Sequence, residues 1–270
     1  MPLPGTHSRR AVCFLDILGF RRMLEQKPLL QLAEQYDRLI SHATSLNRTF
    51  EVNKSHPALF PGHLPGEPYC IRFVFSDSII LIANEDDPVS CLKLMVHVWR
   101  LVQATLAERM PIRGAIACGE MYFDQRKSIF LGPALTRAYE LEQQQDWIGV
   151  AIEPSVSDAY PEVFPAGLDE RSIYESLFLQ YEVPLKDGSR RRLRTVNWRW
   201  NLVVEHGTRW LFPGSSDAAD QIKIKNTLDY AAAVVGSGRI YADDQGKCPA
   251  ELRAFWIGRK EPPFSHGDTL

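Results

Sequence analysis

Cysteine is scarce in this chain of 270 residues, and its five cysteines contain no Cys-x-x-Cys pair. The number is odd and the positions are scattered, which argues against a disulfide framework. Three of the five lie within apolar strand or helix patterns, where cysteine behaves as a small hydrophobic residue. A reducing cytoplasm is therefore the expected compartment.

Long hydrophobic runs, strong net charge and repeats are also missing. No apolar run approaches the ~20 residues that a membrane-spanning helix needs, and the first five residues do not resemble a secretory signal. The formal net charge of −2 provides no general attraction to nucleic acid or to a membrane surface. We expect a cytoplasmic protein with neither nucleic acid nor membrane among its partners.

The composition that remains is that of an ordinary globular protein, with 45% hydrophobic and 24% charged residues. The length allows one large domain, or a domain with a substantial appendage. Hydrophobic periodicity predicts alternating strands and helices. The predicted segments are, in order, a strand over 11–16, helices over 21–26 and 28–48, a loop over 49–68, strands over 70–75 and 79–83, a helix over 87–109, a strand over 111–119, a hairpin over 122–131, a helix over 134–144 and a strand over 147–152.

This order predicts an α+β fold of the ferredoxin-like βαββαβ type, one sheet with its helices on one face. We expect this core to occupy residues 1–160 and a C-terminal extension to occupy 161–270. In the extension, 181–188 and 195–204 read as strands joined by a basic turn, Arg190–Arg194. Those arginines are more typical of a solvated hairpin tip than of a nucleic-acid contact. A helix over 217–235 is predicted with these residues inward: Ile222, Leu228, Ala231, Ala232 and Val235.

The first strand ends in a carboxylate, Asp16, and Gly19 follows three positions later. A strand end delivers its side chain to the rim of a sheet, and glycine lets a ligand approach the main chain closely. The amides at Leu18, Gly19 and Phe20 precede a helix, where free N–H groups suit phosphate. The alternative is that Asp16 only caps that helix.

A second carboxylate, Asp77, stands in the polar triplet between two β-rich runs, at the predicted tip of a hairpin. In a βαββαβ sheet this tip lies beside the end of the first strand, so Asp16 and Asp77 should meet. Two carboxylates, completed by phosphate oxygens and the Ile17 carbonyl, are the ligands that Mg²⁺ prefers. Two such ions can flank a reacting phosphoryl group. The alternative for Asp77 is an ordinary turn aspartate.

Four motifs, in this order and at this spacing, resemble the class III nucleotidyl cyclases over residues 10–152: Phe14-x-Asp16-Ile17-x-Gly19-Phe20, Phe75-Ser76-Asp77-Ser78, Arg113-Gly114-x-Ile116-x-x-Gly119, and Gly132 opening a helix. Further segments resemble the bacterial antiphage cyclases of Pycsar systems: Ser76-Asp77-Ser78, Gly119 to Phe123, Gly132 to Leu135, Ala138 to Glu142, Tyr181-x-Val183-Pro184-Leu185-Lys186, and Asn197-Trp198.

The resemblance implies a head-to-tail homodimer with active sites at the subunit interface. It implies a nucleoside triphosphate substrate, two Mg²⁺ or Mn²⁺ ions, and a 3′,5′-cyclic monophosphate and pyrophosphate as products. Asp16 and Asp77 match the metal-binding positions of the class. Pycsar relatives make cyclic UMP or cyclic CMP, which activates a separate effector protein after phage infection.

Two departures from the class concern the base. Adenylate cyclases carry a base-reading Lys four positions before the second metal Asp, where this chain has Phe73, and a carboxylate where it has Ile129. An apolar site gains little from polar purine groups that it cannot pair, and a pocket narrowed by Phe73 suits a pyrimidine. Arg72 is a further candidate for the base, although strand alternation directs it to the other face.

A third departure concerns the transition state. The class places Asn and Arg at i and i+4 on the helix after the glycine, and here these positions are Thr136 and Glu140. Thr136 can still donate a hydrogen bond, but Glu140 cannot replace an arginine. The nearby candidate cations are Arg113, Arg126, Lys127 and Arg137, and Arg126 and Lys127 stand near the triphosphate-binding arginine of relatives.

The leading hypothesis is a pyrimidine nucleotide cyclase that converts UTP, in preference to CTP, in antiphage defence. Nothing in the residues distinguishes uracil from cytosine. One alternative is a purine cyclase with a rewired base pocket, and another is a cyclase-like dimer that binds a nucleotide without turning it over. A purely structural dimer is a third.

Overall fold

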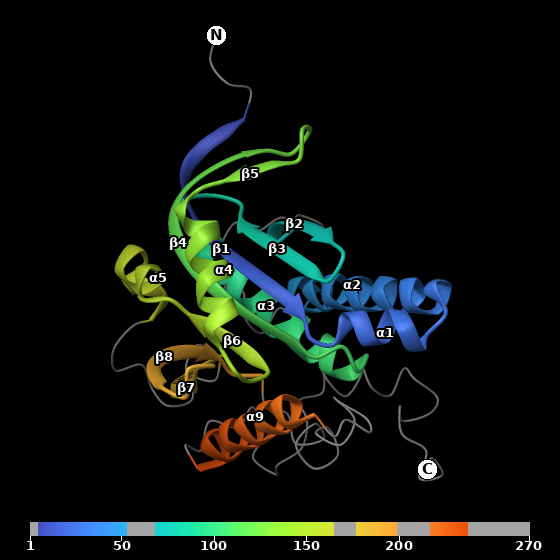
Figure 1. Ribbon diagram of the computed structural model, residues 1–270. Coiled ribbons are helices and arrows are strands. Elements are labelled where there is room, and N and C mark those ends of the chain that lie inside the picture. The colour runs from blue at the N-terminus through green and yellow to red at the C-terminus, as the bar shows by residue number, and fades with distance from the viewer. Residues whose placement is uncertain (1–4, 53–67, 165–176, 199–216, 237–270) are drawn as a thin grey trace.

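The computed structural model describes residues 5–52, 68–164, 177–198 and 217–236 (Figure 1). In chain order its elements are β1 (Thr6–Ile17), α1 (Phe20–Gln26), α2 (Leu29–Val52), β2 (Cys70–Phe75), β3 (Ser78–Ala83), α3 (Pro88–Ala107), β4 (Ile112–Asp124), β5 (Ile129–Leu131), α4 (Pro133–Gln144), β6 (Gly149–Ile152), α5 (Pro154–Ala159), the 3₁₀ turn η1 (Pro161–Val163), β7 (Phe178–Pro184), β8 (Arg190–Val196) and α9 (Ala218–Gly236).

The strands form one mixed sheet in the order β2-β3-β1-β4-β6-β8-β7, and β5 pairs with β4 beside this path. β1 is antiparallel to both β3 and β4, whereas β4 and β6 are parallel. The α+β prediction and the βαββαβ order are therefore confirmed. Several boundaries differ: β1 begins at Thr6 rather than at 11, α2 runs on to Val52, into the segment predicted as loop, β4 runs on to Asp124, and β7 covers Phe178–Pro184 rather than 181–188. The rest of that loop, 53–67, lies outside the described residues.

Helices cover both faces of the sheet, so the prediction of helices on one face was wrong. Along β1, Ala11, Cys13 and Leu15 join the core cluster that contains residues of α2 and α3. The alternate residue Phe14 packs in a cluster with Ala138 of α4. Figure 1 shows α4 and α3 on opposite sides of β1. A central strand that is apolar on both faces requires cover on both.

The C-terminal hairpin continues the sheet of the core, because β8 pairs with β6 as well as with β7. The prediction that Arg190–Arg194 form the turn of this hairpin was wrong, since these residues lie within β8 and the turn falls at 185–189. Arg190, Arg191 and Arg192 are exposed, while the Arg194 guanidinium lies over the Phe164 ring. β6 ends at Ile152, opposite Arg194, which leaves the arginine-rich end of β8 beyond the ladder with β6.

The predicted inward face of α9 was also largely wrong. Ile222 is 51% exposed, and Leu228 and Ala232 are exposed as well, whereas Thr227 and Tyr230 are buried. Ala231 is buried as predicted, and the side chain of Val235 lies outside the described residues. Both buried hydroxyls have partners: Thr227 Oγ1 accepts the Ile148 amide, and the Tyr230 hydroxyl bonds the Val196 carbonyl. A satisfied polar group can enter a core, so apolar spacing alone selected the wrong face.

Four cysteines in the described residues, Cys13, Cys70, Cys91 and Cys118, are free and buried. This agrees with their interpretation as small hydrophobic residues. Among the helices of the described ranges, none combines the length and apolar character required to span a membrane.

Candidate functional site

Asp16 and Asp77 lie side by side at one end of the sheet. Asp16 is opposite Ser78 in the β1–β3 ladder, and the Ile17 amide donates to the Asp77 carbonyl at 2.9 Å. Asp77 belongs to a two-residue turn between β2 and β3, in which Ser76 takes a left-handed φ of 54°. The sequence predicted this meeting, and the tight hairpin produces it.

The surroundings of Asp16 hold more acids than the sequence predicted. Burial, followed by the charges of Glu142 and Asp77, raises the pKa of Asp16 to about 6, while Arg113 and Lys186 act to lower it. Three carboxylates thus face two cations in this corner of the molecule. The local excess of negative charge favours a bound cation.

Arg113 is buried opposite Asp16 in the β1–β4 ladder, but its hydrogen bonds go elsewhere. Its Nε donates to Glu142 Oε1 at 2.7 Å, its Nη2 lies 2.6 Å from the same oxygen, and its Nη1 donates to the Gln145 carbonyl at 3.0 Å. The guanidinium therefore ties β4 to the end of α4. It influences Asp16 by charge rather than by contact.

Glu142 and Lys186 were both missed as members of this site. Glu142 is a carboxylate on α4, a residue type that is rarely fully buried unless it is paired, yet it is fully buried. Lys186 lies in the β7–β8 turn. This turn packs on the end of α4, where the Lys186 amide donates to the Gln144 carbonyl at 2.8 Å. No short-range signal connects a residue near 186 with one near 16.

Tyr36 of α2 is a third residue that the sequence did not assign to the site. Burial first, and then the negative charges of Asp77 and Asp16, raise the pKa of its hydroxyl. Within the described residues, that buried hydroxyl has no hydrogen-bond partner. The aromatic ring of Phe20 packs edge-on against the Tyr36 ring, with 6.3 Å between the ring centroids.

The loop after β1 supports only part of the predicted phosphate seat. Gly19 takes a φ of 73° and caps α1, which is the left-handed conformation that glycine adopts without strain. The Leu18 amide already donates to the Pro111 carbonyl at 2.8 Å, so it is not available to a phosphate in this conformation. The amides of Gly19 and Phe20 remain the candidates.

A divalent cation fits the donor set at Asp16 and Asp77. In the described part of the chain, no group of three or more His, Cys, Asp or Glu side chains is arranged to hold a metal. Mg²⁺ nevertheless commonly binds to only one or two protein carboxylates, because waters and substrate phosphates fill its remaining coordination positions. Asp16 and Asp77, with the main chain at Ile17, are the residues that would hold it.

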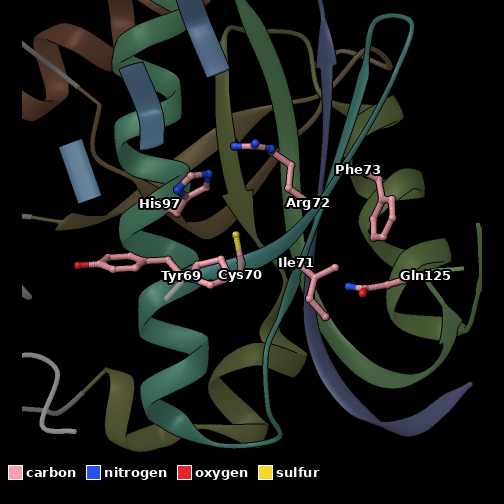
Figure 2. Close-up of a pocket in the computed structure, with 8 residues that line it drawn as sticks. Tyr69, Cys70, Ile71, Arg72, Phe73, His97 and Gln125 are labelled. Atoms are coloured by element: carbon pink, nitrogen blue, oxygen red, sulfur yellow. The ribbon is translucent and has the colours of Figure 1, made fainter. Parts of the chain in front are cut away.

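The two base-binding candidates lie on opposite sides of β2. Figure 2 shows Arg72 on the side of His97, and Phe73 on the other side with Ile71 and Gln125. Phe73 packs against Phe130, with 3.9 Å between ring centroids. Phe73 is opposite Ile80 of β3, and Ile80 is opposite Phe14 of β1. Phe73 is therefore level with the residue two positions before Asp16. Phe73 thus shares the face that carries α4, and Arg72 does not.

The two cations of the β4–β5 turn lie away from Asp16, and the Thr136 hydroxyl is bonded within its own helix. Thr136 is exposed, and its hydroxyl donates to the Gly132 carbonyl of its own helix at 3.4 Å. Arg126 and Lys127 follow Asp124, which is 11 residues along β4 from the partner of Asp16, about 35 Å at strand rise. Within one chain, Arg126 and Lys127 therefore do not reach the Asp16 site.

The chain matches no protein-family model, and no curated protein matches its sequence. Among solved structures it is similar to the catalytic core of a rhodopsin-guanylyl cyclase with converted specificity, in complex with ATPαS. That match has 11% identity and a TM-score of 0.46, and it covers 72% of this chain and 98% of the other.

Two further structural matches have the same character. The adenylyl cyclase CyaB from P. aeruginosa has 13% identity and a TM-score of 0.40, with 72% and 96% of the two chains covered. The guanylate cyclase domain of RhGC from Catenaria anguillulae has 11% identity and a TM-score of 0.42, with 72% and 100% covered. At these values the likenesses concern the fold and assign no activity to this chain.

Proposed function

We propose that the protein is a divalent-cation-dependent nucleotidyl cyclase whose centre is the pair Asp16 and Asp77. The observation that carries the proposal is their juxtaposition: two carboxylates on neighbouring strand ends, beside a glycine-capped helix, in a corner where carboxylates outnumber cations. The chemistry of this donor set is the binding of a metal–phosphate complex. Two Mg²⁺ or Mn²⁺ ions would neutralise phosphate charge in it.

In the proposed reaction the substrate's 3′-oxygen forms a bond with the α-phosphorus. The bond from that phosphorus to the bridging oxygen breaks, pyrophosphate leaves, and the 3′-hydroxyl proton passes to solvent water. The chain contributes by positioning and by charge. Asp16 and Asp77 would hold the cations, whose charge would neutralise the phosphates, and the Gly19 and Phe20 amides donate to phosphate oxygens. Lys186 adds a positive charge beside the same corner.

A pyrimidine nucleoside triphosphate is the proposed substrate, with UTP preferred to CTP. The support is the apolar pair Phe73 and Phe130 on the sheet face that also carries Asp16. Such a wall offers no hydrogen bond to the edge of a purine, and it reduces the space for a second ring. The Pycsar-like motifs extend the proposal to antiphage defence, with the cyclic nucleotide read by a separate effector protein.

A head-to-tail homodimer, with a core over 1–160 and an extension over 161–270, completes the proposal. Its support is the apolar surface beside α4, where Phe75 is 82% exposed and Tyr139 is 48% exposed. Large apolar side chains gathered on one face of a protein commonly mark an interface.

A nucleotide-binding dimer without turnover is the alternative that a specific observation favours. Glu140 stands where the class has an arginine, and it is exposed on α4. Arg113, the nearest buried candidate to replace that arginine, is engaged by Glu142 and by the Gln145 carbonyl. Arg137, the other candidate on α4, donates to the Cys118 carbonyl. The remaining sources of a transition-state cation are Lys186 and a second copy of the chain.

The test is incubation of the purified protein with each of ATP, GTP, CTP and UTP and Mn²⁺, with products identified by mass spectrometry. Cyclic UMP or cyclic CMP supports the proposal, and a cyclic purine nucleotide supports the rewired-pocket alternative. Nucleotide binding without any product supports the binding dimer. Asp77→Ala should reduce product formation at least a hundredfold and abolish Mn²⁺ binding measured by calorimetry.

The matched control is Asp158→Ala, which removes an exposed carboxylate on α5. It should keep both the activity and the Mn²⁺ affinity of the parent protein. Circular dichroism must show that both variants are folded. An Asp77→Ala protein that retains full activity would remove Asp77 from the site.

A further inference from the structure

A second cleft lies at the far end of β1, beneath the β4–β5 ribbon. It has a volume of about 730 Å³, and Arg10, Arg126 and Lys127 are among its lining residues. Arg10 is six residues from Asp16 along the strand, about 20 Å at strand rise. Within the chain this cleft is therefore distinct from the corner that holds Asp16 and Asp77.

Arg10 is buried at this cleft with part of its hydrogen-bonding capacity unused. Its side chain is 6% exposed, and one terminal nitrogen donates to Glu85 Oε2 at 3.2 Å. Its Nε is buried and has no hydrogen-bond partner in the residues that the structure describes. A buried charged donor without an acceptor is costly and rare. An acceptor from a bound anion would satisfy it.

The acids of the cleft neutralise its cations only in part. The Glu85 side chain is 73% exposed, so its charge is well screened by solvent. Asp124 is buried, and its Oδ1 accepts the backbone amides of Arg126 and Lys127, which sets the shape of the turn. The other Asp124 oxygen, Oδ2, lies 3.9 Å from Lys127 Nζ. The cations of the lining are Arg10, Arg126 and Lys127 and its carboxylates are Glu85 and Asp124, so the cleft carries one net positive charge.

Apolar side chains form another part of the wall. Ile71 of β2 and Phe123 of β4 line the cleft with the three cations. Cations beside apolar surface suit a ligand that has a phosphate group and an organic portion. We propose that this cleft is an anion-binding site for a phosphate-bearing small molecule, with Arg10 as its buried anchor and Arg126 and Lys127 as its outer cations.

The site is tested by calorimetric titration of the full chain with inorganic pyrophosphate, at low ionic strength and with EDTA present. The parent protein should bind one pyrophosphate per chain. Arg10→Met should weaken binding at least tenfold, and the double variant Arg126→Ser with Lys127→Ser at least fivefold. Asp77→Ala should leave the affinity within twofold, which separates this site from the proposed metal centre and from the fate of the cyclase proposal.

Arg9→Met is the matched control, because Arg9 is the neighbouring residue on the opposite face of β1 and pairs with Asp86 at 2.9 Å. It removes the same charge and should change the affinity less than twofold. If Arg10→Met fails to fold, as judged by circular dichroism, the Arg126 and Lys127 double variant on the exposed turn decides. The proposal is overturned if the parent shows no saturable binding, or if the folded Arg10→Met or double variant binds as the parent does. In that case water is the partner of Arg10 Nε.

Discussion

At the scale of single residues, Asp16 is the most informative side chain in the molecule. It ends a buried strand, faces Glu142 and Asp77, and is balanced only in part by Arg113 and Lys186. Burial and neighbouring negative charges raise the free energy of an ionised carboxylate, and a bound cation lowers it. The same physical argument applies at the other end of β1, where the buried guanidinium of Arg10 lacks an acceptor for its Nε among the described residues.

The raised pKa of Asp16 predicts how stability depends on pH without divalent cations. Its folded pKa of about 6 lies above the ordinary value of 3.8, so between these values the native state binds more protons than the unfolded state. Stability should therefore fall as the pH rises from 4 to 6. Asp16→Asn should remove that contribution, so that the melting temperature at pH 7 relative to pH 5 is higher in the variant than in the parent. Thermal melts in EDTA at pH 5, 6 and 7 measure this.

A second buried group acts in the opposite direction and is shared by both proteins. Burial lowers the pKa of His97 to about 3, so its contribution to stability is complete above pH 6.5 and is lost as the pH falls. Because His97 is present in parent and variant, the difference between their melts isolates Asp16. Asp158→Asn, at an exposed carboxylate, serves as the control. Identical pH profiles for Asp16→Asn and the parent would contradict the prediction.

At the scale of elements, α4 is the piece that organises the site. It covers the face of β1 and β4 opposite α3, it carries Glu142 to Arg113, and its end receives the β7–β8 turn. This arrangement brings Lys186 within electrostatic range of Asp16 although the two are 170 positions apart. The contribution of the extension to the proposed centre therefore depends on how α4 ends.

Removal of the Glu142 charge should loosen this junction. Glu142→Gln leaves the Arg113 guanidinium buried without its carboxylate, and loss of one partner of a buried ion pair costs about 3 kcal/mol of unfolding free energy. The measurement is urea unfolding monitored by circular dichroism. Glu140→Gln is the matched control on the same helix, since Glu140 is exposed and its change should stay within about 0.5 kcal/mol. Equal effects of the two substitutions would show that the pair does not hold α4.

At the scale of the whole molecule, one sheet face carries both the proposed centre and exposed apolar surface. Phe73, Phe75 and Tyr139 lie on or beside this face, with α4 covering only the β1 and β4 portion of it. The β4–β5 ribbon projects beyond the sheet at the end away from Asp16 (Figure 1). A second copy in the opposite direction would bring such a ribbon toward the partner's Asp16 end.

This surface predicts a dimer that depends on Phe75. Phe75→Glu should convert the protein from dimer to monomer in sedimentation velocity at micromolar concentration, because an apolar contact is replaced by a charge. Leu30→Glu, at another exposed apolar residue but on α2, should leave the dimer intact. A monomeric parent protein, or a Phe75→Glu protein that sediments as the parent does, would count against the proposed assembly.

Local pattern was sufficient for most elements of the core and for two residues of the site. A continuous apolar run predicted β1, and β-rich runs predicted β2 and β3. The Ser76–Asp77 turn joined the last two, so the meeting of Asp16 and Asp77 followed from short-range rules. The buried cysteines and the α+β class followed in the same way. The predictions for Arg72 and Phe73 remain untested, although strand alternation correctly separated their faces.

Only the tertiary structure decided which side of the sheet α4 covers, that Arg190–Arg194 belong to a strand, and which face of α9 is buried. It alone brought Glu142 and Lys186 to Asp16 and set Arg126 and Lys127 apart from it. The physical reason is that a strand's alternation and a helix's periodicity specify a buried face but not its partner. The partner depends on packing between segments distant in sequence, where a satisfied ion pair or hydroxyl can be buried as stably as an apolar side chain.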